Sequence, residues 1–189
     1  MKRPPSLAYL VLAITMFTSL VLAQTKQLTI LSSPLFVVHE KNIMETTDAS
    51  ENHKILVSAL KATDLEDVLG ESGPFTFFAP DDSAFARFSK EEMKSLFEEE
   101  NKHRLKSLLM YHLVAGNISA SKILKALCQG AGRATFTTLQ GTKIGATIKG
   151  SDIILTDAFG HAAKITTADV TQSNGVIHEI DSVILPRGL

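Results

Sequence analysis

The fold is decided around residues 73–85, which read GPFTFFAPDDSAF. The segment 75–79 is a short, aromatic run between two prolines, a pattern that predicts a buried strand. Asp81 or Asp82 can then cap a short helical turn that continues through Phe85, because an aspartate side chain accepts hydrogen bonds from the free amides at a helix start. This stretch therefore predicts a strand that leads directly into a helical turn.

Helical patterns lie on both sides of this stretch. Apolar residues recur at helical spacing before it, at Ile55, Leu56, Ala59 and Leu60. After it, Ser89 and Glu92 match a capping box at the start of a helix whose acidic run, 91–100, is expected on a solvated face. A further apolar stripe predicts a helix of about four turns, and it comprises Leu105, Leu108, Leu109, His112 and Leu113. Ser119 or Ser121 can cap one more helix, ending near Leu127.

Strand patterns dominate the last third of the chain. The glycine-rich break at 130–132 is followed by the alternation of Ile144, Ala146 and Ile148 with polar residues, as a half-buried strand requires. Turn signals recur at hairpin spacing, at 140–141, 150–151, 157–160 and 174–175. The segment 176–185 is expected to form a long closing strand. Helices first and antiparallel strands later predict an α+β fold.

Composition sets the class of protein. The chain has 189 residues, 44% of them hydrophobic, which is enough for one domain with its own core. The net charge of −1 provides no basic field for nucleic acid. Cys128 is the single cysteine, which excludes an intramolecular disulfide and any multi-cysteine metal site, and we expect it to be buried.

The N-terminus predicts export. Lys2 and Arg3 precede an apolar run, 7–22, and the small residue Ala23 then offers a cleavage site, so residues 1–23 are expected to be a signal peptide. Cleavage would change the net charge from −1 to −3 and leave a leader segment at 24–41. An uncleaved anchor is the alternative, but the apolar run is short for a membrane span of about 20 residues. We therefore expect no stable membrane insertion of the mature chain.

Three stretches together resemble the fasciclin domain family. They are the segment 73–85 quoted above, LMYHLV at 109–114, and ITTADV, NGVIHEID and VILP within 165–186. The resemblance covers a single domain, 42–186. It implies a β-wedge of mostly antiparallel strands flanked by N-terminal helices, in a secreted, periplasmic or cell-surface protein that serves adhesion, matrix contact or ligand capture and has no catalytic residues.

The resemblance also singles out Tyr111 and His112, a pair linked to integrin contact in animal members of the family. Carried over, the candidate binding residues are Leu109, Tyr111, His112 and Leu113, with Leu108 and Val114 beside them. The alternative is that these residues belong to the core, since they lie on an apolar helical stripe. We predict a structural His112 whose ring packs in the core and bonds a neighbouring polar group.

Other candidate sites have simpler explanations. The six histidines show no metal-ligand spacing, and helix capping accounts for Asp81 and Asp82, so no metal or cofactor is expected. Neither a serine-hydrolase elbow nor a phosphate loop occurs in the sequence. Asn117-Ile118-Ser119 is an N-glycosylation sequon in a host that glycosylates exported proteins, although Ser119 is equally explained as a helix cap.

The function predicted from the sequence is an exported, non-enzymatic adhesion or matrix-interaction module that binds an extracellular protein or glycan. The alternative is a carrier of a small apolar ligand such as a pigment or lipid. A hydrolase that uses His112 or His178 with an acid is a third hypothesis, for which no motif is present. The residues expected in the core are Phe77, Phe85, Leu109, Leu113, Val176, Ile180 and Ile184.

Overall fold

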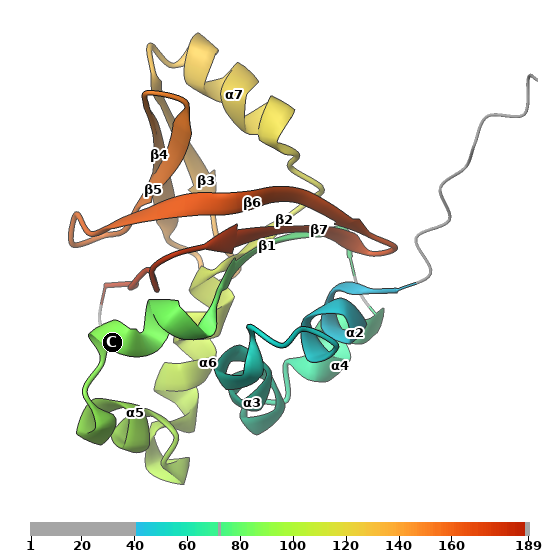
Figure 1. The fold of residues 1–189 in the computed structure, drawn as a ribbon, viewed down its shortest axis with the longest axis vertical. Coiled ribbons are helices and arrows are strands. Elements are labelled where there is room, and N and C mark those ends of the chain that lie inside the picture. Colours follow the sequence, from blue (N-terminus) through green and yellow to red (C-terminus); the bar gives the residue numbers. More distant parts are fainter. Residues whose placement is uncertain (1–40, 72, 188–189) are drawn as a thin grey trace, which may run out of the picture. The chain divides into compact units, whose positions relative to one another are not determined.

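The computed structural model describes residues 41–71 and 73–187 (Figure 1). The predicted signal peptide and all of the leader except Lys41 lie outside the described residues. The helices are α2 (Ile43–Asp48), α3 (Lys54–Ala62), α4 (Glu66–Glu71), η1 (Asp82–Arg87), α5 (Lys90–Leu96), η2 (Glu99–Asn101), α6 (Lys102–Tyr111) and α7 (Ala120–Gln129).

Seven strands form one sheet in the order β2-β1-β7-β6-β5-β4-β3. They are β1 (Phe75–Pro80), β2 (Leu113–Ala115), β3 (Arg133–Thr137), β4 (Lys143–Lys149), β5 (Asp152–Thr156), β6 (Ala162–Gln172) and β7 (Gly175–Ile180). Every neighbouring pair is antiparallel except β1 and β7, which are parallel. The predicted α+β fold with mostly antiparallel strands is thereby confirmed.

Gly175 makes the central pairing of β1 with β7 possible. It faces Phe75 in the register, and a β-carbon at Gly175 would lie 1.9 Å from the Phe75 carbonyl oxygen. Its φ of 153° is also one that side chains rarely adopt. The asparagine–glycine turn seen in the sequence therefore serves a close backbone approach as well as chain reversal.

The sheet curls so that its two edge strands meet. Val114 of β2 forms an isolated antiparallel bridge with Thr138, just after β3, and the Leu139 amide donates to the Leu113 carbonyl at 2.8 Å. Helix α7 packs against β3 and β4 at one end, while α2 to α6 lie on the side of β1 and β7 (Figure 1).

Two cores result, because successive residues of a strand point to opposite faces. Phe77 joins the helix-side core, which includes Leu56 and Leu60 of α3 and Leu105 and Leu108 of α6. Phe78 joins the sheet-side core inside the curl, beside Tyr111, Ile123 of α7, Leu155 and Ile180. All seven residues predicted for the core are buried, so that prediction is confirmed.

Two predicted elements are shorter than expected. Helix α6 ends at Tyr111, so the predicted four turns are wrong. His112 is its C-cap and Leu113 begins β2, where it pairs with Phe77. Strand β7 ends at Ile180, and the chain bends at 181–182 before Ile184 returns to the core. Buried apolar residues continue past the end of α6 and past the end of β7. The apolar pattern in the sequence therefore does not show where either element ends.

Two predictions of burial fail at single residues. Cys128 is exposed, because α7 buries the face that carries Ile123 and Leu127, and Cys128 follows on the outer side. Ile148 is also exposed although it continues the alternation of Ile144, since it lies next to the turn at Gly150, at the end of a hairpin.

The two aspartates after β1 cap different helices. Asp81 accepts from the Ala84 amide at 2.8 Å and so caps η1. Asp82 instead accepts from the Ile55 amide at 2.8 Å and the Lys54 amide at 3.2 Å, at the start of α3. Both act as caps, as expected, but only Asp81 caps the helix that it precedes.

Within the described ranges, none of the helices has the length and apolar character needed to cross a membrane.

Candidate functional site

The predicted binding residues lie together inside the molecule. Tyr111 and Leu113 are fully buried, and His112 and Leu109 expose only 1% and 2% of their surface. Leu108 and Val114 are buried beside them. In this structure the patch offers almost no surface to a partner, and its polar groups bond neighbouring segments of the same chain.

His112 connects α6 to the C-terminal segment 183–186. Its Nε2 accepts from the Ile184 amide at 3.3 Å, so the Nδ1–H donates to the Leu108 carbonyl at 2.8 Å. Burial lowers the pKa of His112 to about 4, which keeps the ring neutral near neutral pH. The packed, hydrogen-bonded geometry predicted for a structural His112 is therefore present, with both ring nitrogens used.

Tyr111 ties the same helix end to the sheet. Its hydroxyl donates to the Lys143 carbonyl at 3.0 Å, at the start of β4. Burial raises the pKa of this phenol, so it remains a neutral donor.

Asp157 holds the C-terminal segment from the other side. One carboxylate oxygen accepts from the amides of Phe159 and His161, each at 2.8 Å. The other accepts from the Leu185 amide at 3.1 Å and lies 2.9 Å from Nδ1 of His161. Burial raises the pKa of Asp157, but these hydrogen bonds outweigh it and lower the pKa overall. Asp157 thus stays ionised and orders the turn between β5 and β6.

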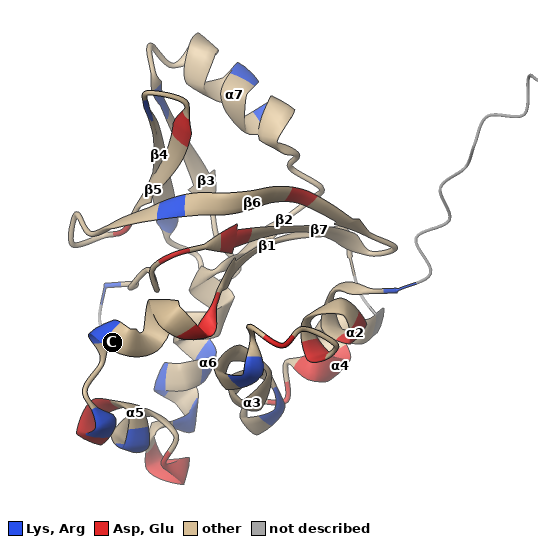
Figure 2. Cartoon of the chain, viewed as in Figure 1, with Lys and Arg blue, Asp and Glu red and all other residues tan. Residues whose placement is uncertain are grey.

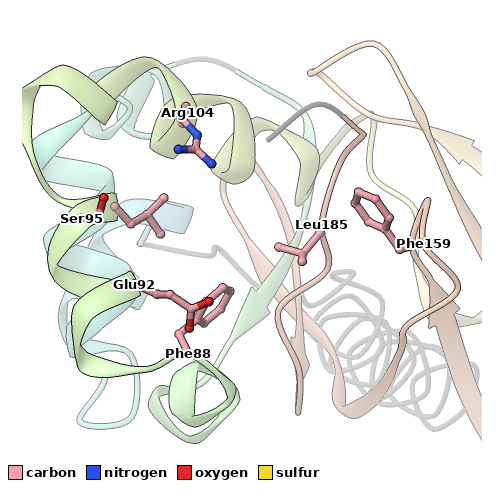
Figure 3. Close-up of a pocket in the computed structure, with 7 residues that line it drawn as sticks. Phe88, Glu92, Ser95, Arg104, Phe159 and Leu185 are labelled. Atoms are coloured by element: carbon pink, nitrogen blue, oxygen red, sulfur yellow. The ribbon is translucent and has the colours of Figure 1, made fainter.

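A surface groove lies where these two supported segments meet α5 and α6 (Figure 3). It has a volume of about 340 Å³ and is lined by Phe88, Glu92, Ser95, Leu96, Arg104, Phe159 and Leu185. Its apolar members come from three segments that are distant in sequence: Phe88 and Leu96 beside and within α5, Phe159, and Leu185. Phe159 is 59% exposed at the turn ordered by Asp157, and Leu185 follows the residue held by His112. The buried hydrogen bonds therefore fix one wall of an open, apolar groove.

The two charges of the groove differ in availability. Glu92 accepts from the Ser89 amide at 2.8 Å in the predicted capping box, and this hydrogen bond lowers the pKa of its carboxyl. Arg104 is exposed and takes part in none of the ion pairs formed among the described residues. Figure 3 shows Arg104 at one end of the groove, across from Phe88 and Glu92. The guanidinium of Arg104 is thus available to a carboxylate beside the apolar surface.

The local sequence patterns contain no direct sign of this groove. Leu96 lies in the acidic run 91–100, which is expected on a solvated face. Phe88 lies between the predicted helical turn through Phe85 and the capping box at Ser89, and Leu185 lies in a predicted strand that ends earlier than expected. The most usable signal is Phe159, a large apolar residue inside a predicted turn, where burial is uncommon.

Two other predicted positions are located by the structure. Asn117 is exposed in the loop between β2 and α7, where Ser119 caps α7. His178 is buried, with its Nδ1 accepting from the Asp169 amide and its Nε2–H donating to the Ile118 carbonyl. Burial lowers the pKa of His178 as well. Among the described residues, no three His, Cys, Asp or Glu side chains are grouped to hold a metal ion.

Comparison with known proteins assigns the family. The profile of the fasciclin domain matches residues 51–186. The chain belongs to the fasciclin domain family. The predicted domain limits of 42–186 remain a prediction, since the matched range begins later.

Related fasciclin-domain proteins occur in bacteria and animals. Protein sll1483 of Synechocystis sp. is 37% identical over 144 residues, covering 76% of this chain and 73% of that protein. Uncharacterized protein sll1735 of the same organism is 34% identical over 145 residues, 76% of this chain and 97% of that protein. Human periostin is 29% identical over 147 residues, 78% of this chain but only 16% of periostin.

A solved structure shares the fold. The FAS1 domain pair of the insect cell adhesion molecule fasciclin I aligns with a TM-score of 0.68 and 20% sequence identity. The alignment covers 77% of this chain and 51% of the fasciclin I chain. This chain therefore shares its fold with the FAS1 domains of that structure.

Proposed function

We propose that this fasciclin domain is an exported, non-enzymatic adhesion module that binds an extracellular protein through the groove between α5, α6 and the C-terminal segment. The observation that carries the proposal is Phe159, a phenyl ring that is 59% exposed yet lies in a turn ordered by the buried Asp157. A rigid aromatic side chain on the surface provides contact area at a small loss of conformational entropy on binding.

The groove suits a particular kind of contact. Its volume of about 340 Å³ is at the lower end of the range for small-molecule sites, and it is an open groove. A pigment or lipid carrier needs to enclose most of its ligand, which favours a protein side chain as the occupant. Arg104 adds a cation at one end, so we propose that the partner presents an apolar residue next to a carboxylate.

Tyr111 and His112 have an indirect role in this proposal. In this proposal Leu109, Tyr111, His112 and Leu113 are positioning residues. His112 holds the C-terminal segment that supplies Leu185, Tyr111 holds the start of β4, and the two leucines are buried beside them. We propose that substitutions at this pair reduce binding by disturbing Leu185 and its neighbours. The sequon at Asn117 lies in an exposed loop, which is compatible with glycosylation in a suitable host.

The test measures attachment of protein-coated beads to cells and matrix of the organism that makes the protein. Phe159→Ser and Arg104→Glu should each reduce attachment at least about tenfold. Ile148→Ser is the matched control, since it removes an exposed apolar side chain from β4, outside the groove. Equal attachment of all four proteins would refute the groove as the binding surface. A pigment or lipid that co-purifies with the exported protein would favour the carrier instead.

A further inference from the structure

A second pocket lies between the helices and the sheet, with a volume of about 140 Å³. Residues from α2, the following turn and His53 line one side, and residues from β1, β6 and β7 line the other. The lining residues are Thr46, Thr47, Ser50, His53, Ala79, Val170, Ile177 and Glu179. Polar groups therefore face a floor that is mostly aliphatic.

His53 has an unused nitrogen at this pocket. The side chain is 3% exposed, and its Nδ1 lies 2.7 Å from Ser50 Oγ. Ser50 Oγ also accepts from the Asn52 amide at 3.3 Å. The buried His53 Nε2 has no hydrogen-bond partner among the described residues. Buried nitrogens are nearly always partnered in proteins, so this one calls for a partner that the described residues do not supply.

Glu179 places a carboxylate on the same pocket. It lies two residues after Ile177 on β7 and therefore shares the face that packs against the helices. Its register neighbour on β1 is Ala79, whose methyl group leaves room beside it. Within the part of the chain that the structure describes, no hydrogen bond or ion pair satisfies the Glu179 carboxylate.

The surrounding charge favours a cation. The amide of Asp81, the N-cap of η1, donates to the carbonyl of Ile180, the last residue of β7, at 3.3 Å. Asp81 and Asp82 therefore lie near Glu179 and Asp181, and Figure 2 shows acidic residues where β1 and β7 end. The Asp82 carboxylate is occupied by the α3 amides, and Lys54 next to His53 is exposed. One carboxylate and one imidazole are too few for a structural zinc site, which takes four ligands.

We propose that this pocket binds a primary ammonium group carried on a short alkyl chain. The ammonium donates to the Glu179 carboxylate and to Nε2 of His53, while His53 Nδ1–H donates to Ser50 Oγ. The alkyl carbons pack on Ala79, Val170 and Ile177. The volume accommodates on the order of five non-hydrogen atoms, as in butylammonium or the end of a lysine side chain. This site is separate from the groove and does not depend on the function proposed for it.

The experiment is an NMR titration of the exported protein with n-butylammonium chloride at about pH 8, where alkylamines are protonated. Saturable shifts are expected for the His53 ring nitrogens and the Ile177 methyl groups, with none from potassium chloride at equal concentration. Glu179→Gln should weaken binding at least about tenfold. Glu51→Gln, which neutralises an exposed carboxylate outside the pocket, should leave the affinity unchanged.

A second titration distinguishes the two sources of the ammonium. An acetylated, amidated glycine–lysine–glycine peptide that binds and displaces butylammonium indicates a lysine of a protein partner. Binding of butylammonium alone indicates a free amine. The proposal is overturned if folded wild-type protein shows no saturable shifts, if potassium produces the same shifts, or if Glu179→Gln, shown to be folded by its thermal transition, binds equally well.

Discussion

Buried polar residues organise this domain at the scale of single side chains. His112, Asp157 and His178 each bond backbone groups of segments that are far away in sequence. Each such bond satisfies a group that would otherwise be buried without a partner, at a cost of about 1–3 kcal/mol. These residues therefore hold loops and the C-terminal segment in place.

Acid should destabilise the fold through His112. Its pKa is about 4 in the folded chain, against 6.5 for an unperturbed histidine side chain, so the unfolded state takes up a proton first. The contribution of the neutral ring to the free energy of unfolding is fully present above pH 6.5. This contribution, up to about 3 kcal/mol, is lost as the pH falls toward 4. His178, whose pKa is also lowered, acts in the same direction.

Urea denaturation between neutral pH and about pH 4 measures this loss. His112→Gln should show a clearly shallower fall over the same range, whatever its stability at neutral pH. Parallel curves for the two proteins would mean that His112 is protonated in the folded state.

Replacement of His112 separates a structural role from a contact role. His112→Ala should destabilise the domain by about 1–3 kcal/mol for the orphaned Ile184 amide, plus the lost packing of the ring. Binding should fall only as far as folding does. The denaturant midpoint and the attachment assay are measured on the same variant. A variant that is fully stable and does not bind would make His112 a contact residue.

At the scale of elements, helices and strands are joined by caps that come from elsewhere in the chain. His53 is the N-cap of α3 but makes no capping hydrogen bond with its side chain. Asp82, at the start of η1, supplies that cap instead. Asp169 similarly accepts from the Ala120 amide at 2.7 Å, at the start of α7.

Removing the distant cap should loosen α3. Asp82→Ala should cost about 1 kcal/mol, because two helix-start amides lose a charged acceptor. Hydrogen exchange should increase in the first turn of α3 and much less in η1, which keeps Asp81. Ser83→Ala provides a neighbouring control. Faster exchange confined to η1 would show that Asp82 caps only its own helix.

At the scale of the whole molecule, β1 connects the two cores. Phe77 and Phe78 are adjacent in sequence and both fully buried, one in each core. The parallel pairing of β1 with β7 then joins the first third of the domain to its last strand. Folding of the sheet therefore depends on contacts about 100 residues apart in sequence.

Truncation of Phe77 tests how tightly the helix-side core is packed. Phe77→Ala should destabilise the domain by about 3–5 kcal/mol, as expected for a large cavity in a closely packed core. Phe159→Ala, at an exposed position, should change stability by less than about 1 kcal/mol. Denaturant midpoints of the two variants make the comparison, and a loss at Phe77 below about 1 kcal/mol would contradict the assigned burial.

Export is predicted for the chain as a whole. Cleavage between Ala23 and Gln24 should leave a mature N-terminus at Gln24, because a charged start, an apolar run and a small residue precede that bond. N-terminal sequencing of the protein from its native host provides the measurement. An intact Met1 in a membrane fraction would indicate the uncleaved anchor.

The sequence by itself determined the family, the α+β class and most elements. Aromatic and alternating runs identified β1 and β4, and the Ser89–Glu92 box identified the start of α5. The seven residues named for the core are buried, although Cys128 and Ile148, which were also expected to be buried, are exposed. These features follow from local periodicity, capping and turn chemistry, which act over a few residues.

Only the tertiary structure decided which surfaces and partners these residues have. The apolar stripe through His112 fits a helix and a buried strand end equally well, and the end of α6 depends on the pairing of Leu113 with Phe77. The groove combines Phe88, Leu96, Phe159 and Leu185, and their proximity depends on the curl of the sheet and on hydrogen bonds to Asp157 and His112. Such contacts join distant segments, so no local pattern encodes them.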